Sequence, residues 1–191
     1  MNALRTYLEQ HLTISDTDWQ IIAQRLTPSE CPKGTKLTTA GRVEDRLYFI
    51  LDGAFRLYFE TESKETTLDI GFAHSLISSY SSYITRRPSD FNLEALTACR
   101  FMSIRHADLL EMYALTDCGQ ELGRILTEQI YLYFSSRENA FLLRSPTERY
   151  LDLFKQQPRL IKEIPLKHLA SYIGVTPQAL SRIRARIVQT D

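Results

Sequence analysis

The residues whose types and spacing most clearly suggest chemistry lie near the end of the chain, within residues 166–187. Gln178, Ser181 and Arg182 follow one another at helical spacing. Amide and guanidinium groups form paired hydrogen bonds with base edges in the major groove of DNA. At roughly 100° per residue, Leu180 and Ile183 fall on the opposite face. The pattern predicts a helix that packs on one side and presents a polar side to a duplex.

The residues before this helix predict a helix-turn-helix. A small residue, Ala170, allows two helices to approach closely, and Gly174 can take the left-handed conformation that a tight turn needs. Leu180 then fills the space between the two helices. Thr176 is a good N-cap, and Pro177 suits the first helical position because its missing N–H would have no partner there.

This arrangement gives each polar residue an expected role on DNA. We expect base-edge contacts from Gln178, Ser181 and Arg182. The residues expected to contact the phosphate backbone are Lys167, Thr176, Arg184 and Arg186.

The charged residues are distributed unevenly along the chain, in a way that agrees with a nucleic-acid partner. The 191 residues carry equal numbers of basic and acidic side chains, and 43% of them are hydrophobic, enough for one core or two modest ones. From Arg144 onward there are nine basic and four acidic residues, so this part carries +5 and the first 143 residues carry −5. A basic end on an acidic body is typical of a regulator that contacts DNA.

The sequence lacks the patterns of an enzyme or a metal protein. It has no nucleophile motif, phosphate loop or paired carboxylates. No metal-ligand spacing links its cysteines and histidines, which are Cys31, Cys99, Cys118, His11, His74, His106 and His168. No signal peptide and no apolar run near 18 residues is apparent, so we expect a cytoplasmic protein without a membrane partner.

The first hundred residues predict a small antiparallel β-roll after two short helices. The helices fall within residues 1–29, where Pro28 is expected to close the second. Aromatic runs at 47–51 and 54–59 flank Asp52 and Gly53, a strong hairpin signal. Further strands are expected at 68–72, 92–96 and 99–105. In the second run Phe55 alternates with Arg56, which predicts one buried and one wet face.

Helices are expected again from residue 107, first a short one at 107–113 and then a long one over about 118–143. The long helix has apolar residues on more than one stripe, so it can cover the roll and also meet a partner helix. The alternative is a helix packed only within its own chain. The residues expected at the dimer contact are Leu122, Ile125, Leu126, Gln129, Tyr133, Ser136 and Ala140.

A capping box at Ser145 and Glu148, with Pro146 at the first helical position, starts another helix that runs to about residue 157. The predicted fold is therefore α+β: an antiparallel β-roll with flanking helices, a long dimerisation helix, and a small all-α helix-turn-helix domain. We expect boundaries at 1–117, 118–144 and 145–191.

This order of elements resembles the CRP/FNR family of bacterial transcription regulators. The resemblance rests on Lys33 and Gly34, on the segment 47–53 with Arg56 after it, and most specifically on 169–182. It implies a cyclic-nucleotide-binding-like roll, a homodimer that binds double-stranded DNA, RNA polymerase as a partner, and a small-molecule effector.

Two departures from the family pattern limit what the resemblance implies. The family's phosphate cassette would lie between Ile70 and Leu96, but no carboxylate follows Gly71 and no arginine directly precedes Asn92. A buried phosphate without a charge partner costs several kcal/mol, so we expect no cofactor and no response to cyclic AMP. The residues that would line the pocket are Gly71, Phe72, His74, Arg86 and Arg87.

The second departure is the end of the chain. Residues 188–191 are too few for the β-hairpin wing that follows the recognition helix in many relatives. The competing interpretation of the whole sequence is a β-roll that binds a small molecule or a protein, with a helix-turn-helix that has no role on DNA.

Overall fold

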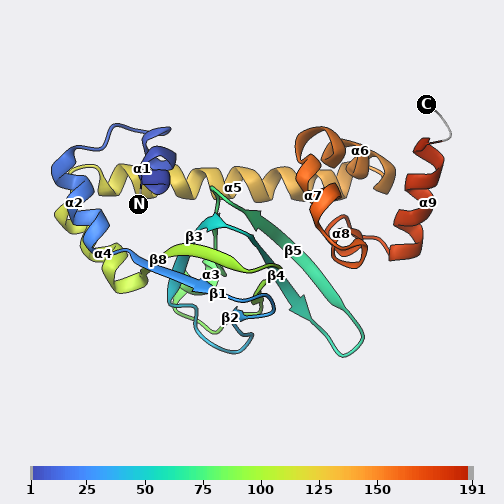
Figure 1. Cartoon of the computed structure of the whole chain (residues 1–191), viewed down its shortest axis with the longest axis horizontal. Helices are drawn as coiled ribbons and strands as arrows, with labels where there is room; N and C mark the ends of the chain where they lie inside the picture. The colour runs from blue at the N-terminus through green and yellow to red at the C-terminus, as the bar shows by residue number, and fades with distance from the viewer. Residues whose placement is uncertain (1, 189–191) are drawn as a thin grey trace.

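The computed structural model describes residues 2–188, with side chains through residue 187. It confirms the α+β fold: a β-roll with helices at one end, a long helix along its side, and a helical domain at the other end (Figure 1). The C-terminal residues 189–191, and with them the expected missing wing, lie outside the described residues.

Two four-stranded antiparallel sheets form the roll, in the orders β1-β8-β3-β6 and β2-β7-β4-β5. The strands are β1 (Thr27–Cys31), β2 (Lys36–Thr38), β3 (Arg46–Asp52), β4 (Ala54–Glu60), β5 (Glu65–Phe72), β6 (Leu76–Ile77), β7 (Asn92–Ala95) and β8 (Cys99–Arg105). Ile50, Phe55 and Leu93 are fully buried in one core cluster of the roll.

The expected hairpin around Asp52 and Gly53 is confirmed as the β3–β4 turn. Gly53 has φ of +91°, and a Cβ there would lie 2.5 Å from the carbonyl oxygen of Ala98. Only glycine meets both demands.

Two expectations about the strands were wrong. Pro28 does not close a helix but lies within β1, an edge strand, where a missing N–H is tolerated. Arg56 is not on a wet face, since it is 1% exposed. Its guanidinium donates to Thr67 Oγ1 at 2.9 Å and to Glu65 Oε2 at 2.8 Å, so partners on β5 replace water.

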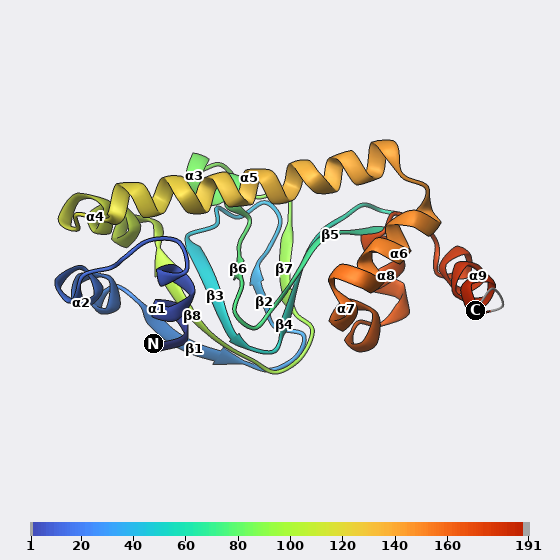
Figure 2. The same cartoon turned by 90° about the horizontal axis from the view of Figure 1, so that it is seen from above.

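Helices close one end of the roll and run along its side. They are α1 (Asn2–Glu9), α2 (Asp16–Gln24), α3 (Tyr80–Thr85), α4 (His106–Leu115) and α5 (Gly119–Leu143). The cluster that joins them to the roll includes Leu8, Ile22, Phe49 and Leu122. Viewed from above, α5 lies along the roll and extends past it to the C-terminal helices (Figure 2).

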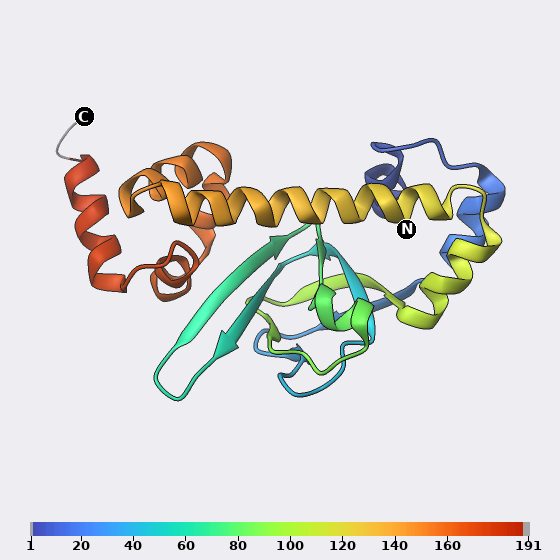
Figure 3. The ribbon, with the colours of Figure 1, turned by 180° about the vertical axis from the view of Figure 1, so that it is seen from behind.

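In the part of the chain that the structure describes, four helices make up the C-terminal domain: α6 (Pro146–Gln156), α7 (Pro158–Glu163), α8 (Leu166–Tyr172) and α9 (Pro177–Val188). The capping box at Ser145 and Glu148 is present. The domain lies beside the β4–β5 hairpin, which extends from the roll towards it (Figures 1 and 3). Ile70 of β5 belongs to the same apolar cluster as Leu160, Leu169 and Leu180.

Candidate nucleic-acid interface and adjoining cavity

The pair α8–α9 has the local geometry that the sequence predicted. Ala170 and Leu180 are fully buried between the helices. Gly174 has φ of +76°, and a Cβ there would lie 2.6 Å from Phe141 Cε1 of α5. Glycine is therefore needed at this position both for the conformation of the turn and for the close packing of the Phe141 ring of α5. Thr176 Oγ1 accepts a 3.2 Å hydrogen bond from the N–H of Ala179, which confirms it as the N-cap.

The predicted base-reading residues lie together on the outer side of α9. Gln178, Ser181 and Arg182 are exposed, while Ile183 on the inner side is 8% exposed. No shielding of this face by the chain itself is seen in the described residues. The outer side is therefore accessible to a groove-sized partner.

The predicted phosphate contacts differ from one another in their surroundings. Thr176 and Arg186 are exposed. Arg184 is half-buried, and its guanidinium carbon lies 5.7 Å from the ring centroid of Tyr150. Lys167 is exposed, and its Nζ lies 3.5 Å from Glu65 Oε2 on the roll. Lys167 and Arg184 therefore have to leave these contacts within the chain if they bind phosphates.

The Lys167 contact belongs to a wider docking of α8 on β5. The backbone N–H of Thr67 donates to Ser171 Oγ at 2.8 Å, and that hydroxyl donates to the carbonyl of Glu65 at 3.1 Å. A strand end of the roll and the first helix of the helix-turn-helix are thereby joined by polar contacts.

A second polar cluster joins the roll, α5 and α8. Tyr133 donates a 2.5 Å hydrogen bond to Asp69 Oδ1, and its hydroxyl lies 3.1 Å from that of Tyr172. The Arg137 guanidinium stacks over the Tyr172 ring, 3.8 Å from its centroid. Burial raises the pKa of Asp69, an effect that the Tyr133 hydrogen bond and the charge of Arg137 oppose.

Beside this cluster is a cavity of about 740 Å³. Its walls come from the roll, from α5 and from the start of α7. Apolar side chains such as Phe72, Leu126 and Ile130 dominate the lining, and Asp69 and Gln129 supply polar groups. A cavity of this size matches the usual range for small-molecule sites.

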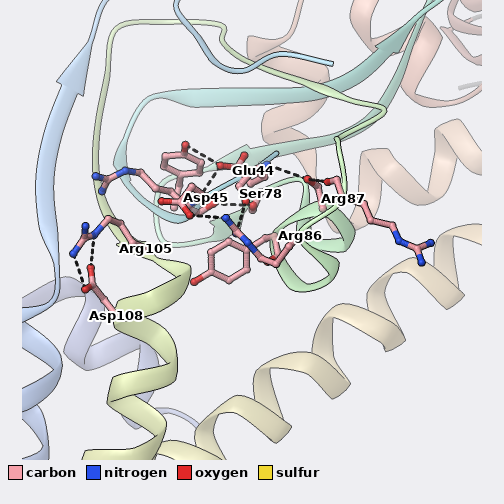
Figure 4. Close-up of polar contacts among 11 residues, drawn as sticks. Glu44, Asp45, Ser78, Arg86, Arg87, Arg105 and Asp108 are labelled. Carbon is pink, nitrogen blue, oxygen red and sulfur yellow. Dashed lines mark hydrogen bonds and ion pairs between the residues drawn. The ribbon is translucent and has the colours of Figure 1, made fainter. Parts of the chain in front are cut away.

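The five expected pocket residues do not come together. Gly71 and Phe72 line the cavity, but His74, Arg86 and Arg87 do not. Arg86, at the end of α3, donates to the carbonyl of Glu44 at 2.8 Å and pairs with Asp45 at 2.7 Å. The Arg87 side chain points away from these partners (Figure 4).

The residues around Arg86 instead fix a buried carboxylate. Glu44 is 3% exposed and accepts from Thr38, from the N–H of Arg46 at 2.9 Å, and from Tyr48 at 3.3 Å. Desolvation raises the pKa of Glu44 in spite of these donors. The cluster joins the loop before β3 to α3 (Figure 4). Its role is therefore structural.

The residues expected at the dimer contact form two groups: those that contact other parts of their own chain, and those that remain half-buried or exposed. Leu122 is 2% exposed and Leu126 packs on the same cluster, so both serve the core of their own chain. Gln129 bonds His11 at 3.0 Å, and Tyr133 bonds Asp69, so these polar ends also have partners within the chain. The remaining expected residues, half-buried or exposed, are Ile125, Ser136 and Ala140.

Sequence reasoning missed Glu65, Asp69 and Ser171 as links between the domains. The only sequence signal was a carboxylate at Asp69 between two apolar residues of a strand. Within residues 2–188, no group of three or more potential metal ligands occurs, and no helix is long and apolar enough to cross a bilayer.

Comparison with known proteins agrees with this architecture. Residues 28–115 match the cyclic nucleotide-binding domain family. A search of the curated proteins finds no match.

Several solved structures share the fold of most of this chain. The c-di-GMP-responsive global regulator CLP of Xanthomonas campestris is 15% identical, with 92% of this chain and 93% of that one covered and a TM-score of 0.68. FixK2 of Bradyrhizobium japonicum is 14% identical, with 86% of this chain and 85% of that one covered and a TM-score of 0.70. A chain described as a CRP/FNR-family transcriptional regulator of Eubacterium rectale is 15% identical, with 92% of this chain and 85% of that one covered and a TM-score of 0.70. The chain thus combines a region matching the cyclic nucleotide-binding domain family with the overall fold of CRP/FNR regulators.

Proposed function

We propose that this chain is a sequence-specific DNA-binding transcription regulator that acts as a homodimer, with α9 of each protomer in a major groove. The observation that carries the proposal is the outer side of α9. Gln178, Ser181 and Arg182 are exposed there together, on a helix whose inner side closes the domain core.

Each side chain has a task that its chemistry suits. The Arg182 guanidinium and the Gln178 amide are able to make paired hydrogen bonds with base edges, and Ser181 adds a single bond. Thr176 and Arg186 flank this face and would contact phosphates. Lys167 would exchange Glu65 for a phosphate, and Arg184 would leave the Tyr150 ring.

A partly exposed stripe on α5 supports the proposed dimer. Ile125, Leu132, Ser136 and Leu143 lie within a narrow sector at 100° per residue. Leu132 is 64% exposed and Leu143 is 80% exposed, so apolar surface is available for a second copy. Two-fold symmetry would place the two recognition helices about 34 Å apart, one turn of DNA. Bound there, the dimer would be positioned to contact RNA polymerase.

The test is selection from a random duplex library, followed by binding at increasing salt. We expect enrichment of a two-fold symmetric site and an affinity that falls linearly with log salt concentration, because phosphate contacts release counterions. A chain that enriches no sequence and is not retained on DNA resin at low salt would contradict the proposal.

A second candidate function is favoured by the cavity next to Asp69: binding of a small effector. The lining is mostly apolar, with a carboxylate on β5, so we propose a largely apolar molecule that carries an amine or another hydrogen-bond donor. A cyclic nucleotide phosphate suits this lining poorly, because Asp69 repels it and Arg159, the lining cation, is stacked on Phe72 at 4.6 Å.

Two measurements test the effector proposal. Calorimetry with cyclic AMP should show no binding, and micromolar binding would contradict our inference. Linear alkylamines of increasing length should raise the thermal unfolding midpoint of the wild type. Asp69→Asn should lose this response. Equal responses in both proteins, or none in either, would argue against the cavity as the site.

A further inference from the structure

Cys31 and Cys99 face each other across two neighbouring strands. Cys31 is the last residue of β1, Cys99 is the first of β8, and the two are Cα partners in the antiparallel ladder. Partners in such a ladder point to the same face, with Cα atoms about 4.5–5.5 Å apart. Disulfides need about 4.4–6.8 Å between Cα atoms. The backbone therefore already holds both residues at a separation that a disulfide accepts.

The two thiols are also neighbours in the packing. Cys99 is a buried member of a core cluster of the roll, and Cys31 packs against that cluster. Both are free thiols, and the Cys99 thiol is near enough to raise the pKa of Cys31. The third cysteine, Cys118, belongs to a different cluster at the start of α5. The chain thus holds one pair and one isolated cysteine.

We propose that Cys31 and Cys99 are a reversible dithiol–disulfide pair that an excess of a small-molecule disulfide oxidises. The Cys31 thiolate attacks one sulfur of that disulfide, forms a mixed disulfide and releases one thiolate. Cys99 then attacks the Cys31 sulfur, its proton leaves to solvent, and a second thiolate departs. Two protein thiols and one disulfide thus give one protein disulfide and two small thiols.

The order of attack follows from exposure. Cys31 is half-buried and can be reached from solvent, whereas Cys99 is 2% exposed. The Cys99 thiol lies 3.4 Å from the carbonyl oxygens of Ala54 and Thr97, contacts it gives up as a donor on oxidation. Burial and the neighbouring thiol raise the pKa of Cys31, so reaction should need a sustained excess of oxidant.

The experiment uses the full chain incubated with excess oxidised glutathione, then denatured and treated with N-ethylmaleimide. We expect a mass loss of two hydrogens, a single maleimide on Cys118, and a non-reduced tryptic map that joins peptide 26–33 to peptide 87–100. The oxidised protein should also unfold several degrees higher, because the bond closes a long loop. Maleimide on all three cysteines, or a bond that includes Cys118, would overturn the proposal.

Single variants test the assigned roles. Cys99→Ser should accumulate a glutathione adduct on Cys31, because the resolving thiol is gone, and Cys31→Ser should stay unmodified at Cys99. Cys118→Ser is the matched control and should form the intramolecular bond as the wild type does. A Cys99→Ser protein without an adduct, or a wild type that keeps a stable one, would show that the pair does not act in this way.

Discussion

Tyr133 of α5 and Asp69 of β5 are joined by a 2.5 Å hydrogen bond at the point where the roll, the long helix and the C-terminal domain meet. The Tyr172 hydroxyl of α8, 3.1 Å from that of Tyr133, brings the helix-turn-helix into the same cluster. The three side chains thus join the roll, α5 and α8 in one hydrogen-bonded cluster.

Tyr133→Phe should therefore destabilise the chain. The substitution removes the hydroxyl donor and leaves the Asp69 carboxylate without its side-chain partner, at a cost of about 1–3 kcal/mol. Urea unfolding followed by circular dichroism measures the loss. Tyr131→Phe is the control, because Tyr131 is 70% exposed on the same helix. Equal free energies of unfolding for the two variants would contradict the role of the cluster.

Gly174→Ala should cost more stability than Gly34→Ala. Both glycines have positive φ, +76° and +85°, so each alanine suffers backbone strain. At Gly34 a Cβ meets nothing within 4 Å, whereas at Gly174 it would lie 2.6 Å from Phe141. We expect the excess at Gly174 to be about 1–3 kcal/mol. Chemical unfolding of both variants checks this, and indistinguishable losses would refute the close approach of α5 to the turn.

The buried carboxyl of Glu44 should make stability depend on pH. Desolvation raises its pKa in the folded chain above the ordinary value of 4.5. The folded state then holds a proton that the unfolded chain releases, so this contribution is present below about pH 4.5 and is lost as pH rises through the folded pKa.

Glu44→Gln removes that titration. The free energy of unfolding of the wild type should therefore fall relative to that of Glu44→Gln between about pH 4.5 and neutral pH. Glu62→Gln, in the exposed β4–β5 turn, gives the baseline for losing a carboxylate elsewhere. A constant difference between wild type and Glu44→Gln over this range would contradict the prediction.

Leu132→Glu should weaken the homodimer. Leu132 is 64% exposed on α5, and a charge within a helix–helix contact opposes association. Sedimentation equilibrium should show a dissociation constant raised at least tenfold. Leu115→Glu, a change at a residue 56% exposed on α4, should leave it unchanged. If both variants dimerise like the wild type, the contact lies elsewhere.

The sequence was most informative where local signals determine the structure. The start of the long helix was predicted within a residue and its end correctly, because apolar periodicity and the capping box after it define both ends. The β3–β4 hairpin followed from Asp52 and Gly53. The buried Ala170 and Leu180 with Gly174 between them likewise depend on contacts within a few residues.

What escaped prediction depends on distant partners. The strands β2 and β6 are three and two residues long, and their partners β7 and β3 lie far away in sequence. The helix α7 begins at Pro158, and Pro165 lies two residues after its end. The local pattern therefore predicts a loop between two helices. Arg56 was predicted to face solvent. It is buried because β5 covers it and α8 packs on β5, and no local sequence pattern indicates these contacts.

The most direct test of DNA binding through α9 compares Arg182→Ala with Arg100→Ala. Arg100 is a charge-matched control on β8 of the roll and is 66% exposed. Fluorescence anisotropy with the selected duplex and a shuffled one should show that Arg182→Ala loses about 1–3 kcal/mol of affinity for the selected duplex and most of its preference. Arg100→Ala should match the wild type on both. If Arg182→Ala binds the selected duplex as tightly and as selectively as Arg100→Ala does, α9 does not read the DNA.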